Sequence, residues 1–311
     1  MRAVVKKVAI APGQRVICIS DIHGNLDLFK ALLRQVDYVA NDMLMLLGDL
    51  YTKGQKGPET LEYIMELAKN PNVHALRGNC DWNGENLRDT ENAWLNGLPH
   101  IIESPEYIFV HGGLQSEDLA AQDAKSCMEA KVFMEQNLAF TRYVVAGHMP
   151  TLNYTHEIPC ANPIVNEEKK IIAIDGGNNI KRGGQLNAFM IRDGAFSFAC
   201  VDGFPTRRVA KAQAAQGGSL YVAWFDRHME VVEVGEDIGL YRHIASGKVL
   251  ELPNDCIWTD GEGDLSAVCG TDYFLPVNVG DEVSIVKVYA DRVLAKKDGV
   301  LGWIWKDCIE L

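Results

Sequence analysis

The 311-residue sequence contains no long hydrophobic run. No stretch approaches the ~18 uncharged apolar residues that a membrane-spanning helix needs, and the first residues lack the apolar core and cleavage site of a secretory signal. C-x-x-C pairs are also absent, and the eight cysteines are scattered, several of them inside apolar strand-like runs. We therefore expect no membrane association and no disulfide framework, and we predict a reduced, cytoplasmic protein.

A basic surface is missing as well. The sequence has 30 Lys and Arg against 42 Asp and Glu, a formal net charge of −12, and both halves of the chain carry the acidic excess. Binding to nucleic acid depends on clustered basic residues that neutralise phosphates, so nucleic acid is excluded as a partner. Hydrophobic residues make up 47% of the chain, which is enough apolar surface for a globular core.

Short apolar runs alternate with segments of helical periodicity in the first part of the chain. The runs predict buried strands at 15–20, 43–47, 73–76, 107–110, 143–146 and 171–174. Apolar residues at helical spacing predict helices after Asn25, a suitable N-cap, and from Pro58, which fits a first turn. Asp193-Gly194 predicts a hairpin. This alternation is typical of an α/β domain whose functional residues lie at the carboxyl ends of the strands.

The composition changes after residue 205. Residues 206–216 indicate a linker or a short helix, and the remainder consists of short strands and turns. We therefore predict a catalytic domain at 1–205, a linker at 206–216 and a small β-rich domain at 217–311. The last stretch resembles the small bacterial SH3-like barrels, with Trp303 and Trp305 either filling the barrel or lining a groove. The resemblance implies a peptide partner for this domain.

Five short polar motifs follow predicted strands within the first 150 residues. They are Asp21-Ile22-His23, Gly48-Asp49, Gly78-Asn79-Cys80-Asp81, His111-Gly112-Gly113 and Gly147-His148. Carboxylate, amide and imidazole groups that converge at strand ends suit ions such as Mn, Fe or Zn better than Ca. Each motif alone is weak, because an isolated histidine is more often structural, but five in order form a specific pattern.

The order of these motifs resembles the calcineurin-like metallophosphoesterases, and more narrowly their phosphoprotein (serine/threonine) phosphatase branch, over roughly residues 14–200. The resemblance implies two facing mixed β-sheets flanked by helices, with the motif loops at one end. It also implies two divalent metal ions, the first held by Asp21, His23 and Asp49, the second by Asp49, Asn79, His111 and His148. Asp49 would bridge them, and a bridging hydroxide would attack the phosphoryl group in line.

The residues next to these predicted ligands help to distinguish the phosphatase branch from the diesterase-like members of the family. Gly147-His148 is followed by Met149-Pro150, so the second His of many diesterase-like members is missing, which favours the phosphatase branch. Gly78-Asn79 is followed by Cys80-Asp81, where that branch has His-Glu, and such a sequence occurs in phosphodiesterase-type relatives. Cys80 and Asp81 are therefore the catalytic candidates, with Cys80 a weak acid for the leaving group, since a free thiol has a pKa of ~8.5.

The predicted phosphate-binding residues are Lys53 and Arg77. Thr52-Lys53 stand where the phosphatase branch has Asp-Arg, so Lys53 keeps the positive charge but loses the bidentate fork of arginine. Arg77 immediately precedes the Gly-Asn motif and is either a second phosphate contact or a surface residue at the strand end.

Three functional hypotheses follow. The leading one is a metal-dependent phosphatase resembling the serine/threonine protein phosphatases, acting on a phosphoprotein or a small phosphoester. The second is a hydrolase of phosphodiesters or dinucleoside polyphosphates that uses the same metal ions. The third is a non-catalytic metal-binding scaffold, against which the presence of all six predicted ligands argues. Without a strong acid, leaving groups that depart as stable anions, such as aryl phosphates and phosphoanhydrides, are favoured.

Overall fold

The computed structural model describes residues 1–84, 86–216, 218–259, 261, 263–267 and 270–310. The chain divides into two compact units. Unit 1 comprises Met1–Thr151, Asn162–Asn179 and Gln185–Asp202, and unit 2 comprises Leu152–Ala161, Ile180–Gly184 and Gly203–Leu311. Gly217 and Leu311, the predicted ends of the β-rich domain, lie outside the described residues. That the two units fold as separate domains stays a prediction.

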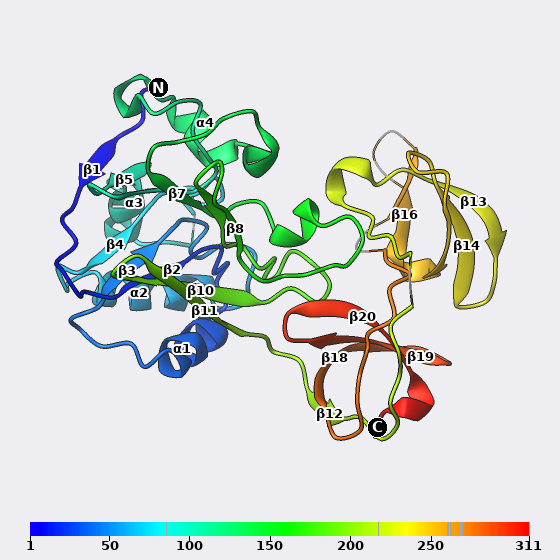
Figure 1. Ribbon diagram of the computed structural model, residues 1–311. Coiled ribbons are helices and arrows are strands. Elements are labelled where there is room, and N and C mark those ends of the chain that lie inside the picture. The colour runs from blue at the N-terminus through cyan, green and yellow to red at the C-terminus, as the bar shows by residue number, and fades with distance from the viewer. Residues whose placement is uncertain (85, 217, 260, 262, 268–269, 311) are drawn as a thin grey trace. The chain divides into compact units, whose positions relative to one another are not determined.

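Unit 1 contains two mixed β-sheets (Figure 1). The six-stranded sheet has the order β1 (Val5–Lys7), β5 (Ile101–Glu103), β6 (Tyr107–Val110), β7 (Tyr143–Ala146), β9 (Ile171–Ala173) and β8 (Ile164–Asn166). The five-stranded sheet has the order β11 (Ala195–Val201), β10 (Leu186–Arg192), β2 (Val16–Ile19), β3 (Met43–Leu46) and β4 (Val73–Ala75). Neighbours β2, β3 and β4 are parallel, and so are β6, β7 and β9.

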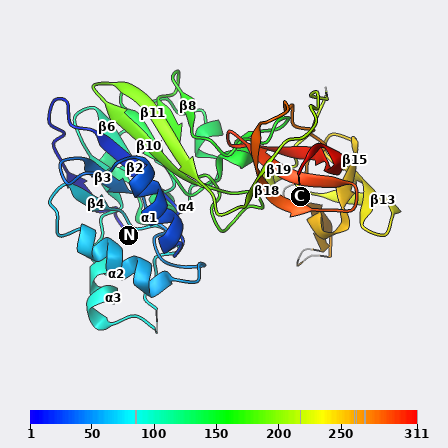
Figure 2. The ribbon, with the colours of Figure 1, turned by 90° about the horizontal axis from the view of Figure 1, so that it is seen from below.

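The alternation of side chains along β2 shows how the two sheets pack. Val16 and Cys18 belong to one buried cluster with Phe109 of β6 and Val145 of β7, so this face meets the other sheet. Ile17 and Ile19 point the opposite way, into a cluster with residues of the helices. Those helices are α1 (Leu26–Gln35), α2 (Gly57–Leu67) and α3 (Asp89–Asn96), which lie on one side of the five-stranded sheet (Figure 2).

The remaining helix of unit 1, α4 (Ala124–Glu129), lies beside the loop that follows β6, where the Gly112 N–H donates to the Cys127 carbonyl at 2.6 Å. The prediction of two facing mixed sheets flanked by helices is confirmed. The expected N-cap of α1 is present, because the Asn25 side chain accepts from the Leu28 N–H, and Pro58 lies in the first turn of α2 as predicted. Asp193-Gly194 joins β10 to β11, with both residues at positive φ, as the hairpin prediction requires.

Unit 2 is rich in β-structure, as the sequence predicts for the last part of the chain. One sheet has the order β12 (Thr206–Arg208), β18 (Glu282–Val288), β19 (Arg292–Lys297) and β20 (Val300–Trp305). A second has the order β13 (Met229–Val234), β14 (Ile238–His243) and β15 (Val249–Pro253), and a third pairs β16 (Ile257–Thr259) with β17 (Leu265–Ala267). Short 3-10 helices occur in both parts of the chain, at Leu119–Ala121, Phe133–Glu135, Thr151–Tyr154, Trp224–Asp226, Asn254–Cys256 and Lys306–Cys308.

The segment 206–216 differs from the predicted linker. Thr206–Arg208 form strand β12, which pairs with β18, and Val209 and Gln213 make isolated bridges with Ile309 and Val277. The composition could not indicate this, because the partners lie far along the chain and the strand is exposed. Among the described residues, no helix is both long enough and apolar enough to span a membrane.

Candidate metal centre

Every predicted metal ligand lies within four residues of the end of a strand of unit 1. The five-stranded sheet supplies Asp21 and His23 after β2, Asp49 after β3 and Asn79 after β4, and the six-stranded sheet supplies His111 after β6 and His148 after β7. Since the strands within each group are parallel, their carboxyl ends lie on one edge of each sheet. The two facing sheets therefore bring all six side chains to one place.

The backbone at these positions adopts an unusual conformation. Asp21, His23, Asp49 and His148 have φ values of 56°, 48°, 53° and 65°, in the left-handed region that residues other than glycine seldom occupy. Such conformations cost free energy and persist where the surrounding structure holds them, often at functional sites. Here all four occur in the loops that follow the strands.

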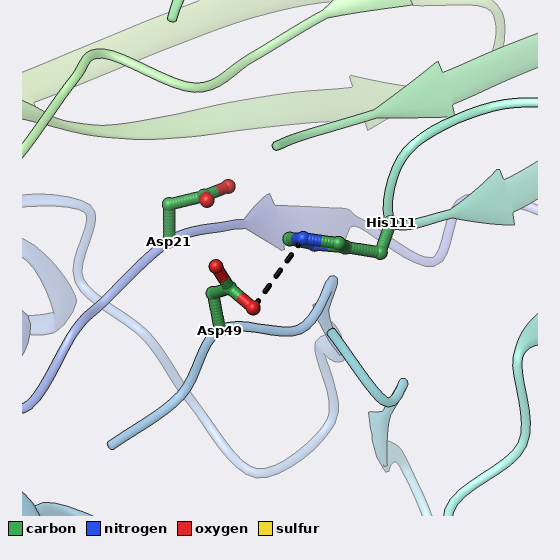
Figure 3. Close-up of side chains that lie close together, drawn as sticks. All are labelled: Asp21, Asp49 and His111. Carbon is green, nitrogen blue, oxygen red and sulfur yellow. Dashed lines mark ion pairs between the residues drawn. The ribbon is translucent and has the colours of Figure 1, made fainter. Parts of the chain in front are cut away.

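Asp21, Asp49 and His111 offer ligand atoms that all lie within 4.8 Å of one another (Figure 3). His111 Nε2 lies 3.4 Å from Asp49 Oδ1 and 3.0 Å from Asn79 Oδ1. His23 Nε2 lies 3.7 Å from both Asp21 Oδ1 and Asp49 Oδ2. These last two separations are too long for hydrogen bonds, but they are what donor atoms around a shared cation would show.

His148 completes the group from the other sheet. Its ring lies beside that of His111, with the centroids 5.1 Å apart, and its backbone N–H donates to Asp21 Oδ2 at 2.9 Å. Ser20 donates a hydrogen bond to the same carboxylate oxygen. Asp21 is thus held by its own strand and by the loop after β7.

The ionisation of the side chains in this group fits a bound cation. Burial raises the pKa of Asp21, and the Asp49 carboxylate raises it further. Burial lowers the pKa of His23 to about 4 and that of His148 to about 3, so both imidazoles are neutral near pH 7 and cannot balance the carboxylates. Buried neutral imidazoles beside buried carboxylates are the donor set that Mn, Fe and Zn take, so the residues present fit divalent metal ions.

Cys80 lies against the candidate bridging residue. Its N–H donates to Asp49 Oδ1 at 2.8 Å, and the Asn79 side-chain amide donates to its sulfur at 3.3 Å. Burial, together with the charge of Asp49, raises the pKa of the thiol to about 12, although a hydrogen bond with Lys53 opposes this. The charge of Lys53 also lowers the pKa of Asp21 and of His148, so the ammonium group acts on the site.

Asp81 and Arg77 are placed differently from the other predicted residues. Asp81 is fully buried, and its carboxylate accepts three backbone N–H groups at 2.8 Å, from Asp49, Leu50 and Gly78. Both of its oxygens are therefore engaged in holding the two loops together. The charge of Arg77 lowers the pKa of His100, which accepts from the Val4 N–H. A phosphate contact by Arg77 stays a prediction.

Asp175 is a site residue that the sequence reasoning did not identify. It follows β9 and is buried, and its Oδ1 accepts from the Gly177 N–H at 2.7 Å, whereas Oδ2 makes no hydrogen bond within the described residues. Burial and the charge of Asp21 raise its pKa. The signal was available, because Asp175-Gly176-Gly177 stands at the end of the predicted strand 171–174, as the recognised motifs stand at the ends of theirs.

Comparison with known proteins agrees with this geometry. The sequence pattern of the calcineurin-like phosphoesterases matches residues 14–174. A symmetrical bis(5'-nucleosyl)-tetraphosphatase of Actinobacillus pleuropneumoniae is 29% identical over 142 residues, covering 38% of this chain and 52% of the relative. The enzyme of the same name from Vibrio cholerae is 27% identical over 138 residues, covering 36% and 51%. The chain thus spans about half the length of the curated relatives that it matches.

A solved structure of a protein serine/threonine phosphatase from Saccharomyces cerevisiae is also similar. It is 14% identical with a TM-score of 0.48, over 66% of this chain and 85% of that one.

Proposed function

The chain belongs to the calcineurin-like phosphoesterases, and we propose that it is a phosphoric ester hydrolase that uses two divalent metal ions to cleave phosphoanhydrides, with dinucleoside polyphosphates as substrates. The metal ions would be Mn, Fe or Zn, held by the six residues that the sequence predicts. The names of the curated relatives support this substrate class, although they cover only part of this chain.

One observation carries the choice of substrate: neither of the two residues that follow Asn79 is placed to give a proton readily to a basic leaving group. The position after Asn79 holds Cys80, a weaker acid than an imidazolium. The next residue, Asp81, uses both carboxylate oxygens to accept backbone N–H groups. A phosphate or nucleotide leaves as a stable anion and needs little protonation, whereas an alkoxide needs an acid.

When bound, the metal ions would lower the pKa of water and neutralise phosphoryl oxygens. The residues of this chain would position the metal ions and the phosphoryl group. Asp49 faces both His23 and His111, which suits a bridging carboxylate, and the Cys80 N–H fixes one of its oxygens. Lys53, whose charge already acts on Asp21 and His148, would stabilise the charge that develops on the phosphoryl group.

A second candidate function is hydrolysis of phosphomonoesters, as in the serine/threonine phosphatase branch. It is favoured by Pro150, which stands two residues after His148, where many diesterase-like members have a second metal-binding His. A proline side chain has no donor atom and cannot serve as that ligand. The two candidates share the metal ions and differ only in the leaving group.

Turnover of three substrates by the Mn-loaded protein separates the candidates. These are diadenosine tetraphosphate, p-nitrophenyl phosphate and a phosphoserine peptide, compared by kcat/KM. We expect the order diadenosine tetraphosphate, then the aryl ester, then the peptide. Faster hydrolysis of the phosphoserine peptide would favour the second candidate, and no turnover of any substrate by metal-loaded protein would favour a non-catalytic scaffold.

Restoring an acid at position 80 should change the leaving-group preference. Cys80→His is expected to raise kcat for alkyl phosphomonoesters about tenfold or more, because a positioned general acid typically contributes ~10²–10⁴-fold. Aryl phosphates and phosphoanhydrides should change much less. The measurement is the slope of log kcat against leaving-group pKa, with Cys127→Ser, a buried thiol on α4, as control. Equal gains for alkyl and aryl esters would place Cys80 away from the leaving group.

For unit 2 we propose the predicted peptide-binding role of an SH3-like domain. Trp303 is buried, whereas Trp305 is partly exposed, stacks on Phe274 with centroids 4.8 Å apart, and lies 5.2 Å from the Arg292 guanidinium. These residues line part of a hollow of about 410 Å³. Aromatic grooves of this kind accept extended proline-rich peptides. Fluorescence anisotropy with a labelled polyproline peptide tests this role. We expect the wild type to bind the peptide and Trp305→Ala to lose binding. No binding by the wild type, or equal binding by both proteins, would contradict the role.

A further inference from the structure

We propose that Trp82 forms a stacking surface for the nucleobase of the substrate, so that the enzyme recognises nucleotides and not only the phosphate chain. This inference rests on the proposed function, since it names the group that binds next to the phosphates. It assigns a binding role to a side chain outside the predicted metal ligands and catalytic candidates.

The backbone that carries Trp82 is fixed to the metal-binding loops from both sides. Asp81, the preceding residue, accepts N–H groups from the loops after β3 and β4. The Tyr51 hydroxyl donates to the Trp82 carbonyl at 2.5 Å, and Tyr51 itself belongs to the buried core. A side chain that starts from so restrained a backbone loses little conformational entropy when it binds a ligand.

The Trp82 side chain is nevertheless exposed. It is 57% exposed, more than Trp224 at 42%, Trp258 at 38% or Trp305 at 37%, all of which lie in unit 2. The other tryptophan of unit 1, Trp94, packs against the hydrophobic core. An uncovered indole is unfavourable in water, and burying it against a flat aromatic ligand recovers that free energy.

The position suits a nucleobase. Trp82 is three residues after Asn79, so their Cα atoms are at most ~11 Å apart, given about 3.8 Å between neighbours. A base joined through ribose to a phosphate at the metal centre extends over a similar range. Stacking needs no positive charge and accepts any base, which fits a chain whose formal net charge is −12.

Kinetics on two substrates test the stacking role. Trp82→Ala is expected to raise KM for diadenosine tetraphosphate about 5- to 150-fold, the effect of losing one stacked base, with little change in kcat. Inorganic tripolyphosphate, which has no base, should keep its KM, and Trp82→Phe should restore most of the nucleotide affinity. Trp224→Ala, an exposed tryptophan in unit 2, is the matched control and should change neither substrate. Equal losses on both substrates would overturn the proposal.

A binding titration separates this inference from the proposed function. AMP added to the Mn-loaded protein should quench tryptophan fluorescence in the wild type and in Trp224→Ala, but not in Trp82→Phe. If quenching depends on Trp82 while diadenosine tetraphosphate is not hydrolysed, the stacking surface stands and the proposed substrate fails. If quenching is the same in Trp82→Phe, the stacking surface is rejected, whatever the protein hydrolyses.

Discussion

Asp49→Asn is expected to lower kcat by on the order of 10³-fold, which corresponds to about 4 kcal/mol of transition-state stabilisation. Asp49 faces imidazoles from both sheets, His23 at 3.7 Å and His111 at 3.4 Å. An amide keeps the shape of the side chain but removes the charge that two cations would share. The measurements are kcat on diadenosine tetraphosphate and bound Mn by atomic absorption.

Thermal stability distinguishes this effect from unfolding. Asp49 lies close to the buried carboxylate of Asp21, and in metal-free protein the two repel each other. Despite burial, His111 and His23 favour the Asp49 carboxylate and lower its pKa, so the two effects oppose each other. Metal-free Asp49→Asn should therefore unfold at a temperature close to that of the wild type, and Mn should raise its Tm much less. Asp27→Asn, which removes an exposed carboxylate paired with Lys56, is the control and should keep activity and the Mn-dependent shift. Full activity in Asp49→Asn would rule out the bridging role.

The convergence of the predicted ligands at one edge of the sheets can be anticipated from the sequence because each follows an apolar strand. Runs such as 43–47 are recognisable by composition, and the parallel arrangement then brings the residue after each strand to a common edge. The spacing of residues along one strand also decides which side chains face the second sheet, so the layered fold can be anticipated. Asp175 also follows an apolar strand, β9, so the same reasoning predicts its position.

Other features depend on contacts that a linear pattern does not contain. The pairing of Thr206–Arg208 with β18 joins segments far apart in sequence, and composition alone suggests a linker there. The exposure of Trp82 could not be read from the sequence either, because tryptophan after a polar loop is as compatible with a core position. For Asp81, residue type and location suggested catalysis, whereas the fold shows three N–H donors around it.

Asp81→Ala should therefore reduce stability and activity together. Three buried N–H groups would lose their acceptor, and each unsatisfied group costs about 1–3 kcal/mol, so we expect the free energy of unfolding to fall by roughly 3–9 kcal/mol. The loops after β3 and β4 would also lose their common anchor. Displacing Asp49 by about 1 Å would lower kcat on the order of 10²-fold.

The conservative variant decides between positioning and proton transfer. In Asp81→Asn the retained oxygen can replace Oδ2, which accepts from both Asp49 and Gly78, while the amide fails to accept from Leu50. A positioning role predicts intermediate stability, partial activity and an unchanged pH profile. A residue that donates a proton to the leaving group would instead lose the alkaline limb of the kcat profile in Asp81→Asn, with little change in urea-induced unfolding. We expect the first pattern, because an acid whose two oxygens both accept buried N–H groups has no free position from which to reach a substrate.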